Sequence, residues 1–265
     1  MTPQVSRDGS DARGNAALKS GIAVLRTFSS DESLLGVSEI AAKVGLHKST
    51  VSRILATLEA EGLVERDTDS RRFQLGLGII AMAGPLLADL DVRRVSYPCL
   101  RDLRRAVGET VALLVWDGTE AVCVEQLPSR SQVKHTTPLG IRYRDAASSS
   151  VQVFLAYADA FTVRRLVTSG AIDLPGADES ALESLQRRLE EVAQRGYAVN
   201  YGETSVDEVG VAAPVFDHRD DPVAAVLVAA PRFRVSRDQV EVIADAAREC
   251  AKDITQRLGG RVAAG

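Results

Sequence analysis

The sequence is poor in cysteine, lysine and aromatic residues, and it has no long apolar run. Its 265 residues include three cysteines, far apart and without a Cys-x-x-Cys pair, which argues against a disulfide framework and a zinc site. No stretch approaches the roughly 20 apolar residues that cross a bilayer. The polar N-terminus lacks the apolar segment of a signal peptide. These absences predict a cytoplasmic protein with no metal site, no cofactor and no membrane contact.

The charge balance is close to neutral. Lys+Arg number 32 and Asp+Glu 36, for a formal net charge of -4. Taken alone, this balance argues against nucleic acid as a partner, because nucleic-acid-binding domains are usually strongly basic. The placement of charge weakens that argument. Residues 36–76 hold six Lys/Arg and six Asp/Glu, and the basic residues gather at 48–53 and 71–72, with the acids mostly elsewhere.

The N-terminal part predicts a polar tail, three helices and a two-stranded wing. Residues 1–14 are polar and predict a disordered tail. The periodicity of apolar residues and the turn signals then predict helices over 16–28, from Ser38 to Gly45 and from about Lys48 to before Gly62, followed by strands at 63–66 and 72–75. Ser38 is the expected N-cap of the second helix, and Gly45 is the left-handed residue that ends it.

The rest of the chain predicts a connecting helix and a mostly antiparallel α+β domain. The pattern is helical from Gly76 to about Arg105, with Pro85 and Pro98 expected to bend or divide it. Beyond it, strands are expected at 111–116, 121–126, 197–201, 209–216 and 223–230, and helices at 146–157, 161–168, around 182–192 and from Ser236.

The second and third helices carry the pattern of a helix-turn-helix motif. The turn of this motif needs a small residue on the first helix, a glycine with positive φ and a branched apolar residue on the second. Ala41, Gly45 and Val51 meet these needs. The opposite face of the second helix is rich in hydroxyls and cations, which contact phosphates and base edges. Its candidate DNA-binding residues are Lys48, Ser49, Thr50, Ser52 and Arg53, with Arg71 and Arg72 on the wing.

The sequence alone also allows a purely structural role for these residues. An Ala/Gly/Val pattern occurs by chance, polar residues on a helix face are often only solvated, and winged helices also serve as protein-interaction modules. A helix in front, a basic second helix and a wing behind favour DNA binding.

The chain resembles the IclR family of bacterial transcriptional regulators. The segments that carry the resemblance follow one another in family order and at family spacing: 17–25, 37–46, 49–58, 62–64, 73–76, 108–113, 195–198 and 212–217. The resemblance covers about residues 15–258.

This resemblance implies a tail at 1–14, a winged helix-turn-helix domain at 15–80, a linker helix at 81–98 and a GAF-like effector domain at 99–265. It implies a homodimer or homotetramer that binds a near-palindromic double-stranded operator and senses a small organic acid or aromatic metabolite. By position in the family pattern, the effector-binding residues are Ser149, Ser150, Gln152, Asn200 and Gly210.

The sequence departs from the family at this site. Val151-Gln152 replaces a Gly-Lys pair, Asn200 stands where an acid is common, and Gly210 stands where a cysteine is common. Ser148, Ser149 and Ser150 could offer hydroxyls and free N–H groups to an anion, or could only cap a helix. A carboxylate, a more neutral effector, or none, stays open.

The sequence gives little support for cofactor binding or for an enzymatic activity. The segment from Gly76 to Ala81 matches a dinucleotide fingerprint, but no parallel strand follows the helix that it starts. No nucleophile or acid–base pair can be assembled, so an enzyme is not expected. An enzyme with a regulatory head and a protein-interaction adaptor are the alternatives, and both predict indifference to Arg53→Ala, unlike a DNA reader.

Overall fold

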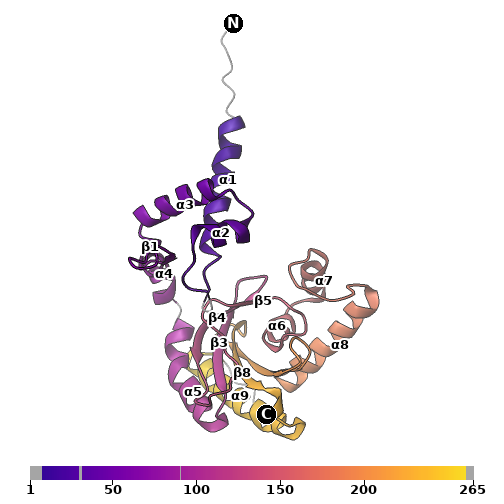
Figure 1. The fold of residues 1–265 in the computed structure, drawn as a ribbon. Coiled ribbons are helices and arrows are strands. Elements are labelled where there is room, and N and C mark those ends of the chain that lie inside the picture. The colour runs from indigo at the N-terminus through magenta and orange to yellow at the C-terminus, as the bar shows by residue number, and fades with distance from the viewer. Residues whose placement is uncertain (1–7, 30–31, 90, 261–265) are drawn as a thin grey trace. The chain divides into compact units, whose positions relative to one another are not determined.

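The computed structural model describes residues 8–29, 32–89 and 91–260, and within them the side chains of 15–29, 32–84 and 92–260. The chain divides into two compact units, Met1–Asp89 and Leu90–Gly265. Each unit has its own hydrophobic core. Figure 1 labels the helices and strands of both units.

The N-terminal unit is built on three helices, α1 (Asp8–Leu25), α2 (Val37–Val44) and α3 (Lys48–Ala60). The predicted helix-turn-helix is confirmed: Gly45 ends α2 in the left-handed region, with φ 66°. The N-cap prediction was wrong, because Gly36 caps α2 and its N–H donates to Glu39 Oε2 at 2.6 Å. Ile40, Ala41, Val51 and Leu55 are buried between the helices.

The wing follows α3 as the hairpin β1 (Val64–Arg66) and β2 (Phe73–Leu75). A bridge between Leu35 and Phe73 ties the hairpin to the segment that precedes α2. After β2, the chain passes close to the turn at the end of α3. A Cβ at Gly76 would lie 2.4 Å from the carbonyl oxygen of Gly62, and one at Gly78 would lie 2.5 Å from it. These glycines are therefore required by close packing of the backbone.

Helix α1 is longer than the sequence pattern predicts. It begins at Asp8, so the predicted disordered tail is helical from residue 8, and its first seven residues lie outside the described part.

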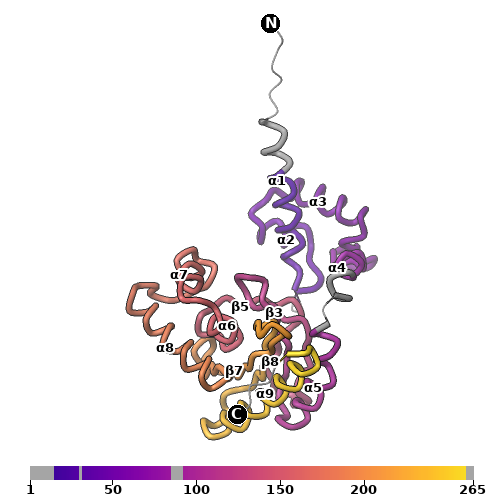
Figure 2. Tube along the Cα trace, turned by 180° about the vertical axis from the view of Figure 1, so that it is seen from behind, coloured from indigo at the N-terminus to yellow at the C-terminus, as the bar shows by residue number. Residues whose placement is uncertain are grey.

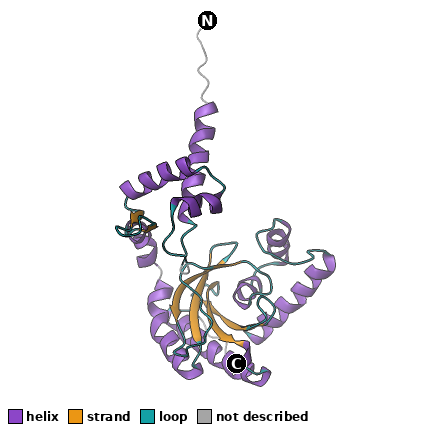
Figure 3. Ribbon diagram, viewed as in Figure 1, coloured by secondary structure: helices purple, strands orange, loops and turns teal. Residues whose placement is uncertain are grey.

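The C-terminal unit contains one six-stranded antiparallel sheet in the order β5-β4-β3-β8-β7-β6. Its strands are β3 (Thr110–Trp116), β4 (Ala121–Leu127), β5 (Arg142–Tyr143), β6 (Ala198–Tyr201), β7 (Glu208–Phe216) and β8 (Pro222–Pro231). The predicted hairpin at Asp117-Gly118 joins β3 and β4. The short edge strand β5 was not predicted. Figure 3 shows the strands enclosed by helices.

Helices cover both faces of the sheet. The helices of this unit are α5 (Asp91–Val107), α6 (Ser149–Leu155), α7 (Ala160–Thr168), α8 (Glu179–Arg195) and α9 (Arg237–Arg257), with a short 3-10 turn at Arg232–Arg234. Residues of α5 and α9 share one core with alternate residues of β7, among them Val209 and Val211. The helices α6, α7 and α8 share a second core with the opposite face, which presents Ala212 (Figure 2). The α+β prediction is confirmed.

The predicted connecting helix is divided differently from expectation. Helix α4 (Gly78–Asp89) belongs to the N-terminal unit, and α5 to the C-terminal unit, where Leu100 and Leu103 are buried. Pro85 lies within α4 and Pro98 within α5, so neither proline ends a helix. The boundary between the two units follows Asp89, ahead of residue 99, at which the effector domain was predicted to begin. It lies there because α5 packs on the sheet and on α9.

Candidate functional site

The exposed face of α3 brings the predicted DNA-binding residues together. Lys48, Ser49, Ser52 and Arg53 are exposed, Thr50 is partly buried, and Val51 and Leu55 anchor the other face in the core. This arrangement follows from the helical period, because residues three and four apart share a face. Within the described part of the chain, no hydrogen bond or ion pair engages the Lys48 or Arg53 side chain.

The same face contains a small apolar residue that the sequence argument missed. Ala56 is exposed and lies three and four residues after Arg53 and Ser52. An alanine methyl can contact the methyl group of thymine in the major groove. Spacing along the helix was the signal that could have identified it.

The two wing arginines differ in their surroundings. Arg72 donates to Glu39 Oε1 and to the Leu34 carbonyl, each at 3.2 Å, and so ties the wing to the start of α2. The Arg71 side chain has no such partner among the described residues, and its backbone lies in the left-handed region, with φ 57°. Of the two cations, Arg71 is therefore the one free to contact a phosphate.

A small pocket of about 290 Å³ lies beside the start of α6 in the C-terminal unit. Ser149, Asn200 and Gly210, which were predicted to bind an effector, line it together with Ser148. Gly210 makes room for Ser149, because a Cβ at this position would lie 3.0 Å from the Ser149 hydroxyl oxygen. The structure thus joins three of the five predicted residues in one pocket.

Ser150 and Gln152 do not line this pocket. The Ser150 hydroxyl lies 3.0 Å from the Ser148 hydroxyl, and both residues are buried. Gln152 is fully buried; its amide donates to the Ala146 carbonyl at 3.0 Å, and its Oε1 has no hydrogen-bond partner in the described structure. Successive helical residues are rotated by about 100°, so only part of this segment can face the pocket.

Asn200 is held by the loop that follows β6. Its Oδ1 accepts from the N–H of Glu203 at 2.9 Å, and its amide contacts the Thr204 hydroxyl. These contacts hold the side chain in place as part of the pocket wall.

The two arginines at the pocket are paired, whereas the lining residues Asp145 and Glu208 have no ion pair among the described residues. Arg142 contacts Asp117 and Glu120, and Arg144 pairs with Asp173 at 2.9 Å. Burial raises the pKa of Tyr143 to about 12, so its phenol stays neutral and can donate. The pocket thus offers hydroxyl and phenol groups rather than an unpaired arginine.

Most of the other pocket residues were missed by the sequence argument. They come from β5, from the segments before α6 and before α8, and from the loop before β7 and the first residue of that strand: Arg142, Tyr143, Arg144, Asp145, Asp173, Thr204, Ser205 and Glu208. They lie far apart in the sequence and share no motif, so only the sheet order could have joined them.

No helix in the described ranges combines the length and the apolar character that a membrane span requires. Nor do three or more His, Cys, Asp or Glu side chains of the described residues gather as metal ligands would. The turn after β7 instead uses Asp217 Oδ1 to accept from the N–H groups of Arg219 at 2.8 Å and Asp221 at 3.1 Å.

Comparison with known proteins agrees with both units. Residues 17–68 match the IclR helix-turn-helix domain, and residues 85–256 match the bacterial transcriptional regulator IclR C-terminal domain. The transcriptional regulator KipR of Bacillus subtilis is 30% identical over 255 residues, covering 92% of this chain and 98% of its own. The transcriptional repressor AllR of Escherichia coli is 29% identical over 248 residues, covering 93% of this chain and 92% of its own.

A solved structure shows the same fold. The crystal structure of an IclR homolog complexed with 4-hydroxybenzoate, from Microbacterium hydrocarbonoxydans, has a TM-score of 0.76 and 25% identity, and covers 91% of this chain and 98% of its own. These domains and relatives are transcriptional regulators and not enzymes. The chain therefore belongs to the IclR family of ligand-responsive, DNA-binding transcriptional regulators.

Proposed function

We propose that this regulator binds a near-palindromic operator as a dimer, with α3 in the major groove, and that a small effector bound beside α6 changes that binding. The observation that carries the first part is the exposed face of α3, which presents hydroxyls and two uncommitted cations and has no carboxylate before Glu59. Lys48, Ser49, Thr50, Ser52 and Arg53 then contact bases and phosphates, and Arg71 contacts the flanking backbone. Arg72 holds the wing in place. This DNA-binding role places the protein in the cytoplasm.

Exposed apolar residues support the dimer. Leu18 and Ile22 on α1 are 64% and 43% exposed, and Ile80 and Met82 on α4 are 61% and 69% exposed. Leu18 and Ile22 share one face of α1, and adjoining exposed apolar side chains are typical of protein contacts. A dimer gives the two reading helices half-sites about 34 Å apart, or a multiple of this distance. A homotetramer would contain two such dimers.

The effector is proposed to be a small organic acid or aromatic metabolite held by hydroxyl groups. The pocket of about 290 Å³ is near the lower limit for small-molecule sites. Ser149 supplies a hydroxyl, Gly210 supplies space and Asn200 shapes the wall. Ser150 and Gln152 are buried behind this lining and hold the start of α6 in place. Because the nearby arginines are paired, an acid would be bound through hydroxyls and Tyr143.

The DNA-binding proposal is tested by selecting bound fragments from the DNA upstream of the protein's own gene. The Arg53→Ala variant should bind each half-site more weakly by roughly 1–3 kcal/mol, and it should lose the sequence preference of the native protein. Arg187→Ala is the matched control, since Arg187 is an exposed arginine of the C-terminal unit. Equal affinity and preference for Arg53→Ala and the native protein would refute the proposed reading helix.

The effector proposal is tested by Gly210→Ala. The added Cβ would lie 3.0 Å from Ser149 Oγ and 3.6 Å from Leu227 Cδ1, so it occupies the pocket. A compound from a panel of organic acids and aromatics that changes operator affinity of the native protein should lose its effect on this variant. Operator binding without the compound should stay the same. Gly21→Ala, which has no atom within 4 Å of the new Cβ, is the control. An unchanged response of Gly210→Ala would exclude this pocket.

A further inference from the structure

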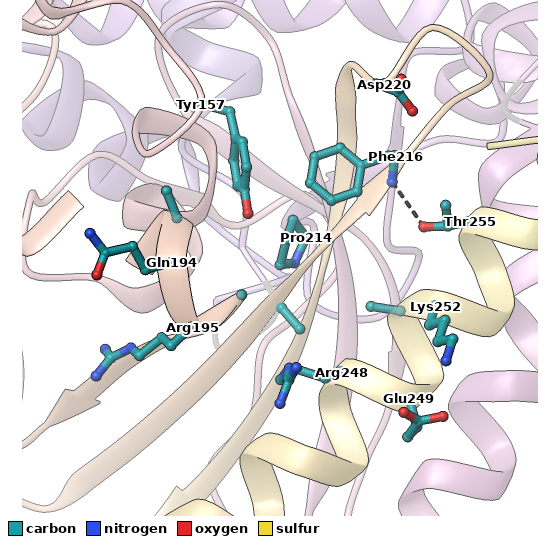
Figure 4. A pocket seen from close by; sticks show the side chains of 14 residues that line it. Tyr157, Gln194, Arg195, Pro214, Phe216, Asp220, Arg248, Glu249, Lys252 and Thr255 are labelled. Atoms are coloured by element: carbon teal, nitrogen blue, oxygen red, sulfur yellow. Dashed lines mark hydrogen bonds between the residues drawn. The ribbon is translucent and has the colours of Figure 1, made fainter. Parts of the chain in front are cut away.

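A second and larger hollow, of about 750 Å³, lies in the same unit. It is bordered by Tyr157, by the end of α8, by the last residues of β7 and by one face of α9 (Figure 4). It shares no lining residue with the pocket beside α6. The proposed function makes no use of it.

The hollow exists because β7 is longer than its neighbour β6. The pairing of β6 with β7 ends at Ala198 and Ala212, while β7 continues to Phe216. In a β-strand, the backbone N–H and C=O groups of residues two positions apart point towards the same edge of the strand. At this open edge Pro214 has no N–H, and the N–H of Phe216 donates to Thr255 Oγ1 at 3.0 Å. The edge is thus stable without a further strand, since neither position leaves a free N–H.

One wall of the hollow is aromatic. The rings of Tyr157 and Phe216 meet edge to face, with centroids 5.0 Å apart and an interplanar angle of 85°. In Figure 4 the Tyr157 side chain points into the hollow, with its hydroxyl towards Pro214. That hydroxyl has no hydrogen-bond partner in the described part of the chain, although Tyr157 is only 38% exposed. The wall therefore offers ring faces and one polar group.

The facing wall carries positive charge. Arg248 and Lys252 stand one helical turn apart on α9 and border the hollow together. Arg248 makes only a long contact with Asp245, 3.4 Å, and Lys252 has no ion pair among the described residues. Arg195 is already committed, since its Nε donates to the Tyr197 carbonyl at 2.7 Å.

Acidic residues also border the hollow, and they limit the choice of ligand. Glu249 and Asp220 line it beside the three cations, so the lining residues carry one positive charge in excess, with Asp245 outside the lining at 3.4 Å from Arg248. A ligand with a single negative charge suits this balance better than a dianion. A flat apolar body suits the aromatic wall.

We propose that this hollow is a second ligand site, which takes an aromatic monocarboxylate. The ring packs against Tyr157, Phe216 and Pro214, and the carboxylate pairs with Lys252 and Arg248. A ligand here contacts α8, β7 and α9 at once, and so gives the regulator an input separate from the pocket beside α6.

The test uses 4-fluorobenzoate as a probe, with its binding to the full-length protein followed by fluorine NMR. 4-Fluorobenzamide, which has the ring without the charge, and fluoroacetate, which has the charge without the ring, should both bind much more weakly. Because the cations are exposed, Lys252→Ala and Arg248→Ala should each raise the dissociation constant about twofold to fivefold, and the double variant about tenfold. Tyr157→Ala should also weaken binding.

Two matched variants locate the probe. Lys134→Ala removes an exposed lysine outside the hollow and should leave binding unchanged. Gly210→Ala fills the pocket beside α6, which is itself proposed to take small acids or aromatics, so the binding that persists in this variant belongs to the hollow. In the Gly210→Ala background, an affinity that Arg248→Ala and Lys252→Ala together leave unchanged, or a complete absence of probe binding, would overturn the proposal. Equal binding of the benzamide would overturn it as well. None of these outcomes depends on operator binding.

Discussion

The two neighbouring arginines of the wing should have different effects on DNA binding when each is replaced by alanine. Arg72 contacts Glu39 Oε1 and the Leu34 carbonyl at 3.2 Å, and the two side chains of the ion pair are 45% and 44% exposed. Arg71 stands at the tip of the hairpin, with no hydrogen bond or ion pair of its side chain among the described residues. We expect Arg71→Ala to remove a phosphate contact and Arg72→Ala to loosen the wing.

The magnitudes follow from these contacts. Each phosphate contact contributes about 0.9 to the slope of log affinity against log salt concentration. A dimer has two wings, so Arg71→Ala should reduce the slope by about 1.8. Arg72→Ala should leave the slope nearly unchanged. It should lower the free energy of unfolding by about 0–1 kcal/mol, because an exposed ion pair contributes little.

The assay is fluorescence anisotropy with a labelled operator at a series of KCl concentrations, together with thermal unfolding of each variant. Arg71→Lys keeps the charge and should keep the slope. An equal reduction of the slope by Arg72→Ala and Arg71→Ala would contradict the different roles of the two arginines, because Arg72 would then leave Glu39 and bind DNA itself.

Three further predictions concern packing, reactivity and pH. Gly76→Ala should destabilise the N-terminal unit by about 1–3 kcal/mol, because the new Cβ would lie 2.4 Å from the Gly62 carbonyl oxygen. Gly21→Ala in α1, where the Cβ meets nothing within 4 Å, should stabilise by about 0.5–1 kcal/mol in the same denaturation experiment. The thiols of Cys99, Cys123 and Cys250 should react slowly with iodoacetamide at pH 8 until the protein unfolds, since burial raises their pKa values, that of Cys123 to about 12. Unfolded thiols ionise near pH 8.5, so the stability from these groups is complete below about pH 8.5 and falls as the pH rises, which urea unfolding at pH 8 and pH 10 can measure.

Local signals in the sequence predicted much of the fold. Gly45 marked the end of α2 because the helix-turn-helix needs a residue with positive φ, and the structure gives it φ 66°. Asp117-Gly118 marked the hairpin between β3 and β4. Ser236 and Gln239 marked the start of α9 through a capping box, which is present. Each of these signals depends on residues within one turn of chain, so no tertiary information was needed.

The pocket beside α6 could be predicted only in part. Ser149 and Gly210 were located by their positions in the family pattern, but the pattern treats residues 149–152 as one block. The helix rotates them to different directions, and Gln152 points away from the pocket lining into the interior. Arg142 and Asp173 reach the site through the sheet edge and the segment before α8. These positions depend on packing, which no local pattern encodes.

Pairing of charges explains how a chain with a net charge of -4 can bind DNA. Within residues 36–76, Lys43 pairs with Glu32 and Arg72 with Glu39, while Arg66 lies over the Phe73 ring at 5.4 Å. Arg66 also donates to the Arg71 carbonyl, so Lys48, Arg53 and Arg71 are left as the cations of this segment whose side chains have no ion pair, hydrogen bond or ring contact among the described residues. A dimer then presents about six such cations, which predicts a salt slope of about −5. Binding to unrelated DNA should therefore be weak, and specificity should depend on two half-sites being engaged together. A slope twice as steep would mean that cations outside α3 and the wing contact the DNA.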